Sequence, residues 1–293
     1  MAEFVEEPFP PPGVDLDHPS VARVYDYLLG GTANWIIDRQ FADKALATLP
    51  ILGSIARANR LFLHRAVRHL VGLGVTQFVD IGSGVPTMGH AHQVADEITP
   101  GETRVAYIDY EPVAVAHSED LLKEHGDPSR HVAIHADMRD PDRLWEKIRD
   151  TGVIDLDKPV GLLLIAVLHV QQPPAEDSGT TDDLGPSLVA HYRDLLRSGS
   201  YLALSHLTDD GVPPEFDDKL ARLVTMYEQS SNPVLCRSHS EIAELFGDFT
   251  MVEPGLTWTP LWHPENTGAG ALTVEFATPN ESACLAGVAR KDE

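Results

Sequence analysis

Apolar residues in the first 75 positions recur at the three- and four-residue spacing of amphipathic helices. One such stripe follows Ser20, a favourable helix-capping residue, and consists of Val21, Val24, Tyr25 and Leu28. We predict that this helix stops at Gly30 and that two more helices span residues 38–48 and 55–71. The preceding residues 1–17 are rich in proline and predict an extended arm. The pattern therefore predicts an N-terminal helical cap over residues 18–75.

Beyond residue 76 the pattern changes to short apolar runs that alternate with helical stretches. The predicted strands are residues 77–81, 104–108, 132–136, 160–168 and 201–205. Runs that are apolar throughout are typical of parallel strands covered on both faces, so the fold class is α/β with a mostly parallel, Rossmann-like sheet. Residues 250–252 and 272–276 predict an antiparallel C-terminal hairpin. We predict one domain over residues 76–280 and a loose tail over 281–293.

The composition fits such a domain, because 43% of the 293 residues are hydrophobic and can bury a large core. The longest apolar run, residues 160–170, is shorter than the roughly 20 residues of a membrane-spanning helix. The N-terminus lacks the basic start and apolar stretch of a signal peptide. The two cysteines, Cys236 and Cys284, lie far apart without metal-binding spacing. We expect a soluble, cytoplasmic protein without membrane contact.

The net charge of −23 opposes binding to nucleic acid, and no nucleic-acid partner is expected. Four arginines in the third predicted helix interrupt this acidity: Arg57, Arg60, Arg65 and Arg68. A solvated helix face explains this run better than a binding patch does. The paired histidines at 90 and 92, and at 131 and 135, lack nearby cysteines and a metalloprotease motif. We therefore expect no metal site.

The most informative segment is the turn after the first predicted strand, Asp80-Ile81-Gly82-Ser83-Gly84. Glycines at this spacing let the backbone approach a ligand where a strand passes into a helix. Asp80 adds a carboxylate, which favours a cation such as the sulfonium-bearing amino acid of S-adenosylmethionine (SAM) over a pyrophosphate. Position 87 is Thr, so the turn does not complete a nicotinamide-binding motif, and an NAD-dependent oxidoreductase is disfavoured.

Two further acids follow the next two predicted strands. Asp109 stands 25 residues after Gly84, close to the spacing of about 20 expected for a carboxylate that binds ribose hydroxyls. Asp137 can accept a hydrogen bond from an adenine amino group. Each acid also fits a structural role, as a helix cap before Glu111 or as a turn residue. Together with the glycine turn, the acids predict an adenosine-type cofactor that lies across the strand tips.

Several other segments carry recognisable patterns, namely residues 19–31, 57–60, 163–169, 200–206 and 252–256. With the Asp80 turn, they make the chain similar, over residues 17–264, to actinobacterial SAM-dependent methyltransferase-like proteins, formerly a domain of unknown function. This resemblance implies a class I methyltransferase fold with SAM as cofactor. It also implies that the cofactor motifs of that fold correspond to Gly82, Gly84, Asp109 and Asp137. Pro86 departs from the wider fold, which often has a third glycine there. The family has no defined methyl acceptor.

The candidate cofactor-binding residues come from the strand tips and from the cap. They are Asp80, Gly82, Ser83, Gly84, Asp109, Tyr110, Asp137, Met138, Ala166, Arg23, Tyr27 and Gly31. The segment 25–34 combines two tyrosines, a glycine pair and an asparagine, which fits a helical lid over the cofactor. A structural helix that ends at glycine fits equally well. Arg23, Arg57 and Arg60 are candidate partners of the SAM carboxylate, although ion pairs within the protein explain each of them better.

Methyl transfer from a sulfonium mainly needs in-line placement of the acceptor and exclusion of water, so a catalytic base is optional. The candidate base is His169, at the tip of the fourth predicted strand, although a packed histidine also explains it. We expect a SAM-dependent methyltransferase whose small or medium-sized acceptor enters between the cap and the loops after strands four and five. Four aromatic residues are candidates for its pocket or for the core: Trp35, Tyr227, Trp258 and Trp262. The alternative is a catalytically silent sensor of SAM or S-adenosylhomocysteine.

Overall fold

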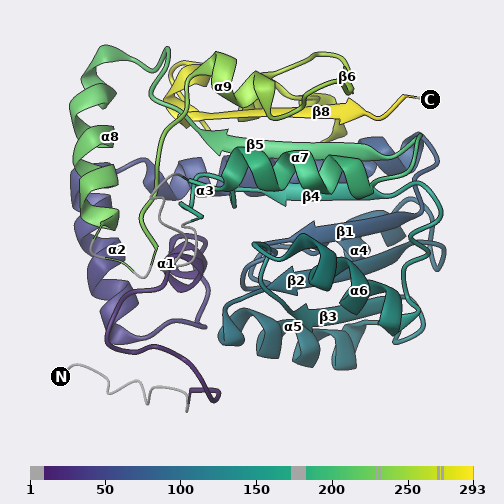
Figure 1. The fold of residues 1–293 in the computed structure, drawn as a ribbon. Helices are drawn as coiled ribbons and strands as arrows, with labels where there is room; N and C mark the ends of the chain where they lie inside the picture. The colour runs from purple at the N-terminus through teal and green to yellow at the C-terminus, as the bar shows by residue number, and fades with distance from the viewer. Residues whose placement is uncertain are drawn as a thin grey trace.

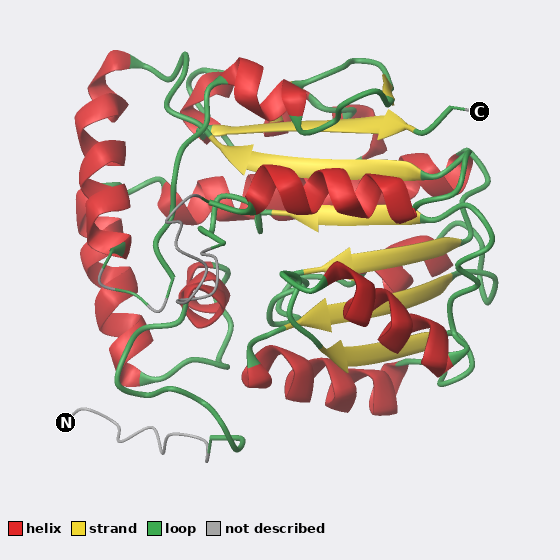
Figure 2. Ribbon diagram, in the orientation of Figure 1, coloured by secondary structure: helices red, strands yellow, loops and turns green. Residues whose placement is uncertain are grey.

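The computed structural model describes residues 10–172, 183–228, 230, 232–268, 271 and 274–292, which form one eight-stranded sheet with flanking helices (Figures 1 and 2). The strands are β1 Gln77–Ile81, β2 Arg104–Asp109, β3 His131–His135, β4 Gly161–Ile165, β5 Tyr201–Leu207, β6 Thr250–Met251, β7 Thr257–Trp258 and β8 Cys284–Arg290. They lie in the order β3-β2-β1-β4-β5-β8-β6, and β7 also pairs with β8. Strands β1 to β5 are parallel, and β8 is antiparallel to its neighbours. The α/β class and the mostly parallel sheet are confirmed.

Helices cover both faces of this sheet and its carboxyl edge. They are α1 Val21–Leu28, α2 Ile36–Thr48, α3 Leu52–Gly72, α4 Ala91–Asp96, α5 Pro112–His125, α6 Pro141–Thr151, α7 Gly185–Leu195, α8 Pro214–Tyr227 and α9 His239–Glu244, with 3-10 turns η1 Thr259–Leu261, η2 Pro264–Asn266 and η3 Pro279–Ser282. Helices α6, α7 and α9 pack on one face, and α3 and α4 pack on the other. Within the described ranges, none of the helices has the length and apolar character needed to span a bilayer.

The central strand β4 shows why its sequence is apolar throughout. Leu162 and Leu164 join the core on the α6–α7 side, whereas Leu163 and Ile165 join the core on the α3 side. All four are buried, and complete burial of such a side chain stabilises a fold by about 1.5–3 kcal/mol. Because successive side chains of a strand point to opposite faces, a strand between two helical layers needs no polar alternation.

The predicted helices of the cap are confirmed as α1, α2 and α3. In Figure 1, helices α1, α2 and α8 lie beyond the arrowheads of β1 to β5, at the carboxyl edge of the parallel strands. Helix α8 comes from residues far along the chain, and its Leu220, Leu223 and Tyr227 share one apolar cluster with Val24 and Phe41 of α1 and α2. This edge is where open α/β sheets bind their ligands.

Three predictions were wrong. Residues 284–290, assigned to a loose tail, form β8 between β5 and β6, while residues 274–276 form no strand and residues 272–273 lie outside the described residues. The arginines of α3 are not a solvated face either. Arg65 is buried and donates to the carbonyl oxygens of Trp262 (2.7 Å) and Thr259 (2.6 Å), because the chain end folds over α3.

Candidate functional site

A cavity of about 500 Å³ lies at the carboxyl edge of the sheet, between the strand tips and the cap. Its walls come from the loops after β1 to β4, from α1, from the middle of α3 and from residues 13 and 15 of the N-terminal segment. This volume falls within the range of about 300–1,000 Å³ that is usual for small-molecule sites. The cavity therefore brings the predicted strand-tip residues and the cap to one place.

The glycine turn after β1 forms one wall and depends on left-handed backbone. Gly82 and Gly84 have φ values of +69° and +67°, which L side chains rarely adopt. A Cβ on Gly82 would lie 2.4 Å from Cγ2 of Val167, so only glycine fits between this turn and the loop after β4. A Cβ on Gly84 would have no atom within 4 Å, because that position faces open space. The turn thus offers bare backbone to a ligand.

Asp109 at the tip of β2 is bonded directly to this turn. Its Oδ2 accepts from the Gly84 N–H (2.8 Å), and its Oδ1 accepts from the Glu111 N–H (2.8 Å). Burial raises the pKa of the Asp109 carboxyl, and these backbone donors partly oppose that rise. Each oxygen accepts one such bond and retains a further lone pair for a ligand hydroxyl.

Asp80 lies behind the cavity rather than in its wall. The side chain is buried, and the Oδ2 atom has no hydrogen-bond partner among the described residues. Burial raises the pKa of Asp80 to about 7, and the Asp109 charge adds to the rise while the Arg60 charge opposes it. The ionised form of this carboxyl is therefore much less favoured than in an exposed aspartate.

Arg60, from α3, lines the cavity beside this carboxyl pair. Its guanidinium donates to the carbonyl oxygens of Met88 (3.1 Å) and Gly89 (2.9 Å), in the loop that follows the glycine turn. On the same helix, Asn59 also lines the cavity and donates to the Tyr25 hydroxyl (3.2 Å). Neither Tyr25 nor Asn59 was predicted as a site residue. The only sequence signal for Asn59 was its place in the 57–60 segment.

The loops after β2 and β3 form another end of the cavity. Asp137 accepts from the backbone N–H of Arg139 (2.9 Å) and forms an ion pair with its guanidinium (2.6 Å). Burial raises the pKa of Asp137, but these bonds outweigh it and hold the pKa below the usual value. The Arg139 guanidinium also lies over the exposed Tyr110 ring, 5.9 Å from its centroid. The turn and ligand interpretations of Asp137 are compatible, since Asp137 and Met138 both line the cavity.

The loop after β4 forms the remaining wall. Ala166 has a φ of +58°, unusual for a residue with a side chain, and its N–H donates to Ser205 Oγ (3.0 Å). His169 lines the cavity, and burial together with the Arg237 charge lowers its pKa to about 4. Its ring contacts that of the buried His206 edge-on at 5.8 Å. His206 in turn accepts from Arg237, so it is held in place behind His169.

Three predicted cofactor-binding residues of the cap lie outside the cavity wall. Arg23 is fully buried against Asp38, and the Tyr27 hydroxyl donates to Asp43 (3.0 Å). Gly31 is needed for a structural reason, because a Cβ there would lie 1.8 Å from Oδ1 of Asp26. The four candidate aromatic residues also lie outside the wall and pack into hydrophobic clusters, as Trp262 does against Phe62.

The model of a family described as S-adenosyl methyltransferase matches residues 9–292. The chain belongs to the S-adenosyl methyltransferase family. This methyltransferase is similar to the solved structure of a candidate methyltransferase from Thermobifida fusca, with 34% identity, a TM-score of 0.81 and coverage of 97% of this chain and 99% of that one. It is also similar to a DUF574 family protein from Streptomyces avermitilis, with 32% identity, a TM-score of 0.79 and coverage of 94% and 98%. No curated protein matches the chain.

Family membership confirms the predicted cofactor class, SAM, and the class I methyltransferase fold. The residues present fit this cofactor. The turn offers bare backbone at Gly84, Asp109 keeps free lone pairs, and the buried Asp80 carboxyl has an unpartnered oxygen close to the same turn. Among the described residues, no group of three or more His, Cys, Asp or Glu side chains is arranged to hold a metal ion.

Proposed function

We propose that this methyltransferase transfers the methyl group of SAM to a small or medium-sized acceptor that binds between α1 and the loop after β4. The observation that carries the proposal is the continuity of the cavity. One continuous cavity reaches from the glycine turn and Asp109 to His169. A cofactor at one end and an acceptor at the other would therefore share a single chamber, which methyl transfer requires.

The arrangement of the cofactor follows from the chemistry of each wall. Asp109 would accept hydrogen bonds from the ribose hydroxyls, since Oδ2 bonds to the glycine turn, Oδ1 bonds to the Glu111 N–H and each oxygen retains a lone pair. Asp137 and Met138, at the next strand tip, would contact the adenine. The amino-acid end would then lie near Asp80 and Arg60, where one group favours an ammonium and the other a carboxylate.

The cofactor supplies an electrophilic methyl group on a sulfonium, so the protein has to orient the acceptor and keep water out. Val21, Leu29 and Val170 give the acceptor side of the cavity an apolar lining, while Gln172 and Asn232 supply amide groups that can orient a polar atom. His169 is uncharged at neutral pH because its pKa is about 4. An uncharged imidazole does not repel the sulfonium and can accept a hydrogen bond from the acceptor, although its low pKa makes it a weak base.

Incubation of the protein with methyl-labelled SAM and host cell extract tests this function. We expect a labelled small molecule with the wild type and much less of it with Asp109→Ala, because cofactor binding is weakened. The variant His169→Asn should bind SAM normally and give less product. Tight SAM binding by a wild type that never yields labelled product would contradict catalysis and favour the sensor.

A further inference from the structure

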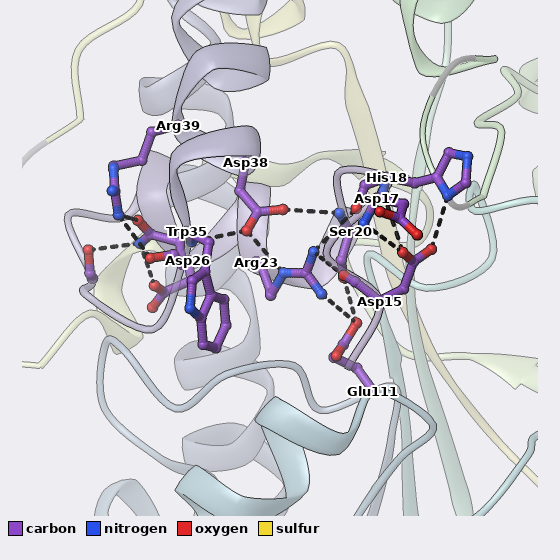
Figure 3. A network of polar contacts seen from close by, with 12 residues as sticks. Asp15, Asp17, His18, Ser20, Arg23, Asp26, Trp35, Asp38, Arg39 and Glu111 are labelled. Carbon is purple, nitrogen blue, oxygen red and sulfur yellow. Dashed lines mark hydrogen bonds and ion pairs between the residues drawn. The ribbon is translucent and has the colours of Figure 1, made fainter. Parts of the chain in front are cut away.

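A buried polar network joins the N-terminal segment to the cap (Figure 3). At its centre the guanidinium of Arg23 and the carboxylate of Asp38 are both 0% exposed, with Nε and Oδ2 2.8 Å apart. The same carboxylate accepts from the backbone N–H groups of Ser20 (3.0 Å) and Trp35 (2.9 Å). Because a buried charge is costly without its partners, these groups must stay together in the folded cap.

Arg23 also holds residues 13–18, which we call the strap. Its Nη2 donates to the carbonyl oxygens of Asp15 (2.8 Å) and His18 (3.1 Å). The Asp15 carboxylate accepts from the N–H of Asp17 (2.7 Å), which folds the strap into a turn that presents both carbonyls to the guanidinium. Gly13 and Asp15 line the cavity, so the guanidinium fixes a piece of its wall.

The network then reaches the site through Glu111. Oε2 of Glu111 accepts from the Ser20 hydroxyl (2.6 Å) and lies 3.6 Å from Nη1 of Arg23. The backbone N–H of Glu111 donates to Asp109, which also accepts from Gly84 (2.8 Å each). A continuous series of contacts therefore links the strap, the cap and the glycine turn.

We propose that Arg23, Ser20 and Glu111 form a latch, with Arg23 as a positioning residue that holds the strap against the cavity and controls the exchange of SAM and S-adenosylhomocysteine. The proposal rests on the proposed function, in that SAM is the ligand of the cavity. Arg23 lies outside the cavity wall, whereas Ser20 and Glu111 form part of it. They act through Asp109 and through the wall that the strap provides. Opening the latch removes part of that wall, so the bound cofactor leaves faster.

The first test measures the rate of SAM dissociation by stopped flow. Ser20→Ala removes the bond to Glu111 and leaves the Arg23–Asp38 pair intact. We expect dissociation to become about 3- to 10-fold faster, the effect of losing one hydrogen bond of ordinary strength. Glu111→Ala should act in the same direction. The double variant should dissociate no faster than the faster single variant, because both changes open the same contact.

The matched control is Ser54→Ala on α3. Ser54 contacts Arg57 (3.4 Å), outside the latch and outside the cavity wall, so its removal should leave the dissociation rate unchanged. An unchanged rate in Ser20→Ala would overturn the latch. Independent, multiplicative effects of Ser20→Ala and Glu111→Ala would overturn it as well.

The second test needs no cofactor. Hydrogen exchange, read by mass spectrometry in the unliganded full chain, should be faster in the strap of Arg23→Met than in the wild type, with exchange in β4 unchanged. Equal exchange in the strap would overturn the proposal. If Arg23→Met does not fold, the strap of Ser20→Ala is compared instead, with the same two outcomes. A wild type that fails to bind SAM would overturn the proposed function, whereas strap exchange would still decide whether the latch exists.

Discussion

The two ends of the cavity are built in different ways. At the end near β1 and β2, backbone and carboxylate groups bond to one another, as Asp109 does to both Gly84 and Glu111. At the end near β4, the wall consists of apolar side chains, two amides and the uncharged His169. The first end has a geometry that fits one ligand closely. The second end selects a ligand mainly by its shape, because its wall carries few fixed charges.

This difference explains why the cofactor is easier to infer than the acceptor. A ribose or a sulfonium must meet specific donors and charges, and those residue types recur at the strand tips. Apolar side chains accept many molecules of suitable size. The rigid cofactor end should therefore tolerate substitutions less well than the permissive acceptor end.

The largest effect is expected from Gly82→Ala. Left-handed backbone costs a residue with a side chain about 1–2 kcal/mol, and the clash with Val167 adds overpacking of about 1–3 kcal/mol. Gly84→Ala has the same backbone cost but no clash, so it is the matched control. Urea unfolding should give a clearly larger loss in the free energy of unfolding for Gly82→Ala. Equal losses in the free energy of unfolding for the two variants would mean that the turn does not pack closely against the loop after β4.

The next effect separates the two ends of the cavity directly. Asp109→Ala should weaken SAM binding by about 1–3 kcal/mol, since a buried ligand hydroxyl loses its acceptor. Asn232→Ala, in the wall of the acceptor end, should leave the SAM affinity unchanged. Calorimetric titration measures both. If Asn232→Ala weakens binding as much as Asp109→Ala, the cofactor extends into the second end and the contrast fails.

A smaller effect concerns the pH dependence of SAM binding. Asp80 is protonated below its pKa of about 7, and the positively charged cofactor favours the ionised form. The affinity should therefore rise between pH 6 and 8, by at most about tenfold per pH unit, with release of a proton on binding. The stability of the free protein changes in the opposite direction with pH. Because the pKa of Asp80 is raised in the folded state, its contribution to stability is lost as pH rises through 7. Asp80→Asn should remove the dependence; a persistent slope would point to Asp109, whose pKa is also raised.

The smallest effect is the titration of His169. Its NMR resonances should shift with a midpoint near pH 4, far below the ordinary value of 6.5, because burial and Arg237 disfavour the charged ring. The uncharged ring of His169 contributes to the free energy of unfolding above pH 6.5, and this contribution is lost as pH falls toward 4. Arg237→Met should raise the midpoint. A wild-type midpoint near 6.5 would mean that the acceptor end carries a positive charge in mildly acidic solution.

The sequence predicted the parts of this molecule that depend on local pattern. The strand tips and glycine turn lie within short segments whose spacing limits their structure. Asp109 stands at the predicted strand tip, and its bond to the turn was not predicted. Ser20 occupies the predicted cap position of α1, but its hydroxyl donates to Glu111, 91 residues away. Local pattern cannot indicate such a partner. The same holds for Arg65, whose carbonyl acceptors come from η1 and the residue that follows it.

Strand β8 was missed because its residues do not have the composition of a strand. The segment Cys284-Leu285-Ala286-Gly287-Val288-Ala289 is rich in small residues of low strand propensity. Its position explains them, since Gly287 packs so closely that a Cβ would lie 2.8 Å from Met251 Cε. Tertiary packing, rather than propensity, selects the small residues here.

The position of β8 also affects how this fold can be made. Strand β5 is hydrogen-bonded to β8 over seven residue pairs, from Tyr201↔Arg290 to Leu207↔Cys284. Until the ribosome has translated β8, the edge of β5 that will pair with it is bare and β6 has no neighbouring strand. The sheet can close only after residue 290 has left the exit tunnel. Nascent chains that pause earlier expose that edge to other strands, which favours aggregation during synthesis.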